Sequence, residues 1–146
     1  SYADLSSANL SSADLRSANL RYADLRYADL KEVKKDFIKR LTLAKTEAKG
    51  LYDFLMKGKI EGTSYEGECA CFCGTIANLR KENYKKMTID LRPEGSSPTE
   101  RFFMGISKGD IPQNNPVSDV VRIWIEEFAE ANEIKLPRYE IMAVPE

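Results

Sequence analysis

The first 30 residues of the chain divide into six pentads that share one pattern. They are SYADL, SSANL, SSADL, RSANL, RYADL and RYADL. Leucine stands at every fifth position (Leu5, Leu10, Leu15, Leu20, Leu25 and Leu30), with alanine two residues before it and aspartate or asparagine between them. A period of five matches neither the period of a helix nor that of a strand, so neither element places all six leucines on one face.

A four-sided coil accommodates this period, because each pentad then forms one side and turns one corner. Leucine and alanine point inward, and the crowded interior requires the small alanine. The A(D/N)LXX motif resembles the pentapeptide-repeat family, which implies a right-handed quadrilateral β-helix over residues 1–31, with four pentads to a coil. The alternative is a disordered low-complexity tract, which would not keep leucine in strict register.

The repeat segment is expected to mediate self-association. Six pentads make only one and a half coils, whereas stacked repeats normally need about three units before a continuous core forms. The open end must be covered by the rest of the chain, by repeats upstream of Ser1 or by another copy. We expect another copy, held through the six leucines from Leu5 to Leu30.

Several pentapeptide-repeat proteins are long acidic rods that mimic DNA and bind type II topoisomerases, and the resemblance extends this role to the present chain as an alternative. Here the repeat is short, and it contains four aspartates and three arginines. The side chains on the outside of such a coil would carry both signs of charge, which disfavours DNA mimicry.

The complete absence of histidine restricts the chemistry of the chain. It excludes the Ser-His-Asp triad, the Cys-His pair and zinc sites with histidine ligands. The composition therefore favours binding over catalysis, and we expect no catalytic residue, no cofactor and no metal. With 22 basic and 23 acidic residues, no overall field attracts nucleic acid or an anionic membrane. No apolar run approaches the roughly 20 residues that span a bilayer.

Residues 32–146 are expected to form an α+β domain with three helices. Apolar residues recur at spacings of three and four from Val33 onward and predict a helix ending near Gly58. A second helix is predicted over Glu68–Arg80. A third contains Val117 to Phe128, with Asn115 as N-cap and Pro116 as first helical residue. The stretch from Lys31 to Ile60 has a net charge of +5, which indicates either a solvated helix face or a surface for phosphate groups.

About three strands are expected in the same domain. Alternating patterns predict them over Met87–Leu91, Arg101–Ile106 and Arg138–Val144. A competing pattern, Ser97-Pro98-Thr99-Glu100, is typical of a helix start, with a serine cap and proline at the first position.

Two segments of this part, YEGECACFCGTIANL and SPTERFFMGISKGDIPQNNPVSD, resemble the C-terminal part of uncharacterised phage and prophage pentapeptide-repeat proteins. This resemblance implies no activity.

Three cysteines lie within five residues, at Cys69, Cys71 and Cys73. This clustering is unlike a disulfide framework and indicates reduced thiols in the cytoplasm. Too few ligands are available for tetrahedral zinc. Packing of the thiols in the core is the favoured interpretation. Ligand contact, or a nucleophile with Glu68 or a lysine as base, remains open.

Polar residues in the predicted loops form a candidate ligand-binding site. Arginine and amide side chains beside a helix N-terminus suit phosphate or another anion. The candidates are Arg92, Glu100, Arg101, Lys108, Asp110, Asn114, Asn115 and Cys69. The alternative is ordinary turn chemistry, with Asn115 only capping a helix.

These observations predict a non-enzymatic binding and assembly protein of the cytoplasm. Its partners are expected to be itself and either a small anionic, nucleotide-like ligand or a protein. We do not expect binding to a membrane or to nucleic acid. One alternative is a small enzyme that uses Cys69, or Glu68 with Asp110. Another is a protein-directed inhibitor such as a topoisomerase-binding DNA mimic.

Overall fold

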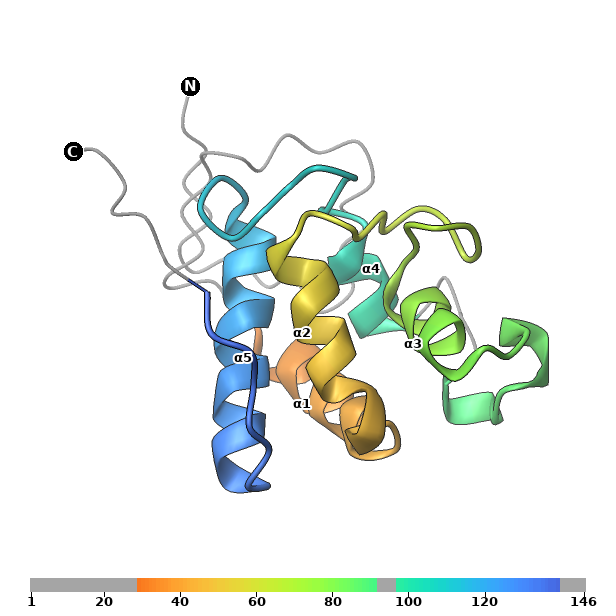
Figure 1. Cartoon of the computed structure of the whole chain (residues 1–146), viewed down its shortest axis with the longest axis horizontal. Helices are drawn as coiled ribbons and strands as arrows, with labels where there is room; N and C mark the ends of the chain where they lie inside the picture. The colour runs from red at the N-terminus through yellow and green to blue at the C-terminus, as the bar shows by residue number, and fades with distance from the viewer. Residues whose placement is uncertain (1–28, 92–96, 140–146) are drawn as a thin grey trace.

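The computed structural model describes residues 29–91 and 97–139, which form helices joined by turns and extended segments (Figure 1). The α-helices are α1 (Lys31–Thr42), α2 (Ala48–Met56), α3 (Phe72–Arg80), α4 (Pro98–Phe103) and α5 (Pro116–Ala131). Short 3₁₀ helices are η1 (Lys45–Glu47), η2 (Tyr84–Lys86) and η3 (Ile89–Leu91). Helices hold 58% of the described residues, and an isolated β-bridge joins Ile60 to Ala70.

The expected fold class, a right-handed quadrilateral β-helix followed by an α+β domain, is wrong. The described residues are helical and contain no strand. Residues 1–28, which carry nearly all of the pentads, lie outside the described residues. The proposed boundary between residues 31 and 32 stays a prediction.

An aromatic cluster at the centre of the molecule holds the helices together. The ring of Phe37 in α1 lies 5.5 Å from that of Phe72 in α3, centroid to centroid. It also lies 6.0 Å from Phe103 in α4 and 5.9 Å from Trp124 in α5. All four side chains are buried. A single residue of α1 therefore contacts three other helices, and each ring pair adds about 0.5–1.5 kcal/mol to the gain from burial.

The predicted helix from Val33 to Gly58 is in fact two α-helices with a break between them. Ala44, at the break, has φ −131° and ψ 38°, outside the helical region. The guanidinium of Arg80 in α3 donates a hydrogen bond to the Leu43 carbonyl at 3.1 Å, a group that α1 leaves without a helical partner. Ala44 and Ala48 are both buried despite the break. The apolar spacing alone therefore did not reveal it.

The strand predicted over Met87–Leu91 is wrong, and these residues include η3. Met87 and Leu91 are buried, but Ile89 is 68% exposed. A strand would place all three residues on one face. A tight turn instead directs the first and last inward and the middle one outward.

The strand predicted over Arg101–Ile106 is also wrong, because the helix-start signal just before it prevails. Ser97 is the N-cap of α4 and its hydroxyl accepts a hydrogen bond from the Glu100 amide, while Pro98 is the first helical residue. In the predicted strand Arg138–Val144, Arg138 and Tyr139 are not in a strand. Its other residues lie outside the described ranges.

The two remaining helix predictions are confirmed. The helix predicted over Glu68–Arg80 is α3, which begins later, at Phe72. In α5 Pro116 is the first residue, and the Asn115 side chain accepts a hydrogen bond from the Ser118 amide at 2.9 Å. Within the described ranges, no helix combines the length and the apolar character needed to cross a membrane.

The segment before α3 lies directly against the first turn of that helix. A Cβ at Gly74 would come within 2.3 Å of the Tyr65 backbone oxygen and 2.7 Å of the Ala70 side chain. Glycine is therefore required at this position for close approach of backbone to helix, rather than for an unusual φ.

Replacing Gly74 with alanine is expected to lower the free energy of unfolding by about 1–3 kcal/mol, because the loop must move away from α3. Chemical denaturation followed by circular dichroism measures this change. Gly50→Ala in α2 is the matched control, since a Cβ there meets only the flexible Leu79 side chain. It should stay within about 1 kcal/mol of wild type. Equal effects of the two substitutions would contradict the steric argument.

Candidate functional site

The cysteine cluster lies at the start of α3. Cys71 is the N-cap of this helix, and its sulfur accepts a hydrogen bond from the Gly74 amide at 3.4 Å. Cys71 and Cys73 are fully buried, whereas Cys69 is half-buried. A thiol in the N-cap position performs the role usually taken by serine or aspartate. Two of the three cysteines are therefore part of the helix start and the core.

Glu100 connects the first turns of two helices. It belongs to α4, yet its Oε1 accepts a hydrogen bond from the Cys73 amide of α3 at 3.0 Å. The side chain is almost completely buried, with 1% of the residue exposed. Its second oxygen, Oε2, is buried with no hydrogen-bond partner among the described residues. Glu100, Cys71 and Cys73 thus form a thiol–carboxyl cluster within the core.

Burial controls the protonation of this cluster. Loss of water raises the pKa of Glu100, although the Cys71 and Cys73 thiols and the Cys73 amide act against that rise. Burial, followed by the charge of Glu100, raises the pKa of both thiols far above the usual range. Both thiols remain protonated at neutral pH, and a protonated thiol is a poor nucleophile. The cluster is better suited to packing than to covalent chemistry.

Within residues 29–91 and 97–139, no three or more cysteine, aspartate or glutamate side chains are arranged to hold a metal ion.

Sequence reasoning missed Asp36, which anchors the start of α4. Its Oδ2 accepts hydrogen bonds from the Thr99 amide and hydroxyl, at 3.1 and 2.5 Å, and from the Ser97 hydroxyl at 3.1 Å. Arg40, one turn further along α1, pairs with the same oxygen at 3.0 Å. Burial alone would raise the pKa of Asp36, but the hydrogen bonds from Thr99 and Arg40 outweigh it and the pKa is lowered. Nothing in the basic sequence around Asp36 indicates this role.

The loop before α5 is held together by its own polar groups. Asp110 Oδ2 accepts hydrogen bonds from the Ser107 amide at 2.8 Å and the Asn115 side-chain amide at 2.9 Å. The same Asn115 amide donates to the Gly105 carbonyl at 3.0 Å. The Asn114 oxygen accepts a hydrogen bond from the Ile111 amide at 3.1 Å. Ordinary turn chemistry, with Asn115 capping α5, accounts for these contacts.

A second residue that the sequence did not indicate, Glu61, ties this loop to the one after α2. Its carboxylate accepts hydrogen bonds from the Lys108 amide at 3.1 Å and from the Thr63 hydroxyl at 2.7 Å. The Gly109 amide donates to the Gly58 carbonyl at 2.8 Å. Two loops that are distant in sequence therefore lie side by side, with backbone groups of each paired to the other.

The structure brings some of the predicted ligand-binding residues together and separates others. Asp110 and Asn115 are in direct contact, and Glu100 is directed into the start of α3. Arg101 is half-buried in the last turn of α4. Arg92 lies outside the described residues. Binding of a ligand by this set stays a prediction.

A family model described as pentapeptide repeats matches residues 1–34, with eight copies. The resemblance of the N-terminal segment to this family is therefore confirmed, over less than a quarter of the 146 residues. No curated protein and no solved structure matches the chain. The likeness of the C-terminal part to phage and prophage proteins has no support from any relative.

The buried carboxyl of Glu100 gives a testable dependence of stability on pH. The pKa of Glu100 is raised in the folded state. The stability that depends on its neutral form is therefore fully present below pH 4.5, the ordinary pKa of a glutamate. This stability is lost as the pH rises through the pKa of the folded state. Glu100→Gln keeps a neutral side chain of the same shape. Relative to wild type, this variant should gain free energy of unfolding as pH rises, by at most about 1.4 kcal/mol per pH unit.

Urea denaturation at a series of pH values between about 4 and 9 measures this difference. Glu68→Gln is the control, because it removes an exposed carboxyl from the segment just before α3. A difference between Glu100→Gln and wild type that stays constant across the series would contradict the assignment.

Proposed function

We propose that this chain is a non-enzymatic binding and assembly protein. Its repeat segment brings copies of the chain together, and its helical part binds a protein partner or a small anionic ligand. The observation that carries the non-enzymatic part is the position of the sulfur atoms of Cys71 and Cys73, both of which are buried. A nucleophile must reach its substrate as a thiolate, and these two groups have neither access nor charge.

The alternative, a small cysteine- or carboxylate-dependent enzyme, rests on few residues. Cys69 is half-buried. Asp110, the candidate partner of Glu68 in a carboxylate pair, already accepts hydrogen bonds from Ser107 and Asn115. These bonds hold the loop before α5 together.

Alkylation with iodoacetamide at neutral pH tests the role of the thiols. Cys71 and Cys73 should remain unmodified in the folded chain, because both are buried and protonated. Cys69 is only half-buried and should be modified before the other two. Mass spectrometry of the digested chain assigns each site, and alkylation in denaturant, where all three cysteines should react, is the control. Rapid modification of Cys71 or Cys73 in the folded chain would contradict their burial. Modification of Cys69 much faster in the folded chain than in denaturant would favour the enzyme hypothesis, in which Cys69 is the nucleophile.

Self-association through the repeat segment is supported by the match of the family model to residues 1–34 and by the six leucines in register. Light scattering of the full chain should give a mass above the 16.5 kDa of one chain. Leu15→Asp with Leu20→Asp should lower that mass, because charges would replace apolar contacts. Ser12→Asp with Ser17→Asp adds the same charge at positions without leucine and should leave the mass unchanged. A single-chain mass for wild type, or equal masses for the two variants, would contradict the proposal.

A further inference from the structure

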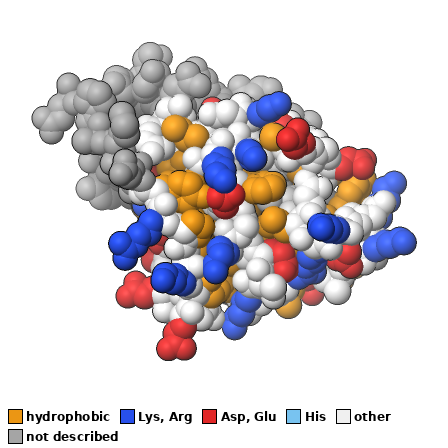
Figure 2. Space-filling view, in the orientation of Figure 1, with side chains coloured by type: hydrophobic (Ala, Val, Ile, Leu, Met, Phe, Trp, Pro, Cys, Tyr) orange, Lys and Arg blue, Asp and Glu red, His pale blue; other side chains and the backbone are white. Residues whose placement is uncertain are grey.

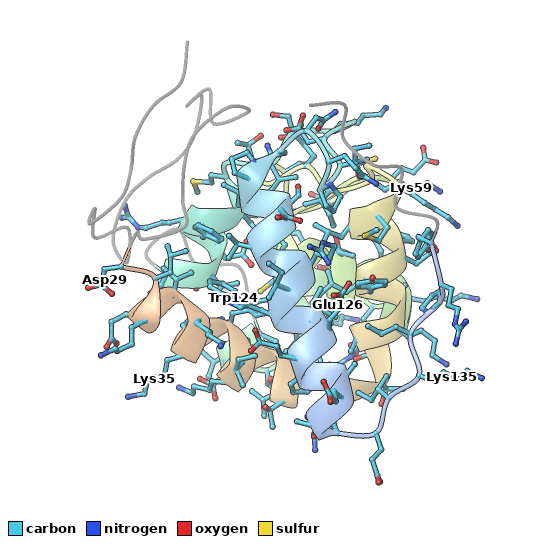
Figure 3. The ribbon with its side chains drawn as sticks, turned by 90° about the vertical axis from the view of Figure 1, so that its left-hand side faces the viewer. Asp29, Lys35, Lys59, Trp124, Glu126 and Lys135 are labelled. Carbon is cyan, nitrogen blue, oxygen red and sulfur yellow. The ribbon has the colours of Figure 1, made fainter. Side chains whose placement is uncertain are left out.

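Three lysines form a continuous basic stripe on α1. Lys31, Lys35 and Lys39 follow one another at intervals of four residues, so they lie on one side of the helix over about 12 Å. All three are exposed, while Val33, Phe37 and Leu41 on the opposite side are buried. In Figure 3 Lys35 projects from α1 away from the body of the molecule. None of the three side chains forms an ion pair with a described residue.

An acidic group lies at the end of α5. Glu127 and Glu130 are in its last turns, and Glu133 follows one residue after the C-cap, Asn132. Figure 2 shows acidic side chains at the lower end of this helix. Glu127 pairs with Lys34 at 3.0 Å. Glu130 and Glu133 are exposed and have no ion pair with a described residue. We call Glu127, Glu130 and Glu133 the acidic end.

Part of each charge group lies at the unfavourable end of its helix, although Lys39, in the last turn of α1, lies at the favourable end. Positive charges destabilise the N-terminal part of a helix and negative charges destabilise its C-terminal part. Lys31 and Lys35 lie near the start of α1, and the last turn of α5 contains no basic residue to balance its glutamates. Like charges four residues apart also repel each other. Lys31, Lys35, Glu130 and Glu133 therefore carry charges that no ion pair with a described residue balances.

The two groups are neighbours on one surface. The ion pair between Lys34 and Glu127 joins the start of α1 to the end of α5, and Figure 3 shows α1 crossing behind the lower half of α5. One chain thus presents a basic stripe and an acidic end side by side. A second copy related by a two-fold axis presents the same pair in reverse order, which is the self-complementary arrangement of an isologous interface.

We propose that the basic stripe of one chain docks on the acidic end of α5 in a second copy, with the reciprocal contact formed at the same time. The contact places the start of α1 in one chain beside the end of α5 in the other, so the helix dipoles and the side-chain charges are both complementary. Ile123, one turn before Glu127 and 39% exposed, supplies an apolar contact within this surface. The inference rests on the proposed assembly function and assigns it a second surface, outside the repeat segment.

Zero-length cross-linking of lysine to carboxylate tests this contact in the full chain. Two variants are co-expressed. The first keeps the lysines and carries Glu130→Gln with Glu133→Gln; the second keeps the glutamates and carries Lys31→Gln, Lys35→Gln and Lys39→Gln. A bond between Lys35 and Glu130 can then arise only between two chains. We expect such bonds at about 50 mM salt and a several-fold lower yield at about 500 mM, because salt screens exposed charges.

Two internal controls accompany this measurement. A bond between Lys34 and Glu127 forms within each folded chain and reports that both variants keep their structure. Lys45 and Lys49 are exposed lysines outside the stripe and should form no bond to Glu130 or Glu133.

The possible outcomes separate the hypotheses. Bonds from Lys31, Lys35 or Lys39 to Glu130 or Glu133 support the proposal. A Lys34–Glu127 bond without any of these would overturn it. Protection of the three lysines from acetylation without such bonds would indicate a different acidic partner, and the second-copy assignment would then be wrong. If light scattering shows assembly but no bonds form, only this inference fails; a single-chain mass would remove the proposed function as well.

Discussion

The arrangement of the helices depends on the carboxyl group of Glu100, which is buried away from water. Glu100 is part of α4, but it accepts its hydrogen bond from the first turn of α3. Removing a carboxyl from water is costly unless it is neutral or fully paired, and one oxygen of Glu100 has no hydrogen-bond partner within the described residues. The apolar contacts around Phe37 must offset that cost. Asp36 contributes as well, because it binds the start of α4 from the side of α1 and so fixes the position from which Glu100 extends.

Sequence periodicity predicted the helices whose apolar face is long and regular, and capping residues predicted where α5 begins. The α5 prediction was accurate because Asn115, Pro116 and the apolar face all indicate one structure. Short segments were the failures. Alternation over five or six residues suits a strand. The segment around Ile89, which is exposed, instead forms a 3₁₀ turn. The segment that follows the Ser97 cap forms the helix α4. The break at Ala44 escaped detection because both halves of the helix bury the same periodic residues.

The candidate site was less accessible to sequence reasoning than the fold. Core packing of Cys71 and Cys73 was the favoured interpretation, and the structure buries both. Glu100, which accepts the hydrogen bond of the Cys73 amide, lies 27 residues further along the chain than Cys73. The sequence places Glu100 among loop residues, because a charged side chain is rarely expected inside a core. Asp36 and Glu61 carry no local pattern at all, since their importance comes from amides that only the folded chain brings to them.

Trp124 is the only tryptophan of the chain, and 6% of it is exposed. Its indole lies 5.6 Å from the ring of Phe102 in α4 and 5.9 Å from Phe37 in α1, so it lies where three helices meet. Its fluorescence is therefore a native optical probe of that junction. Separation of α1 or α4 from α5 would let water reach the indole and shift its emission, whereas association between intact cores would leave the emission unchanged. The emission of Trp124 therefore distinguishes opening of the helical core from association of intact chains.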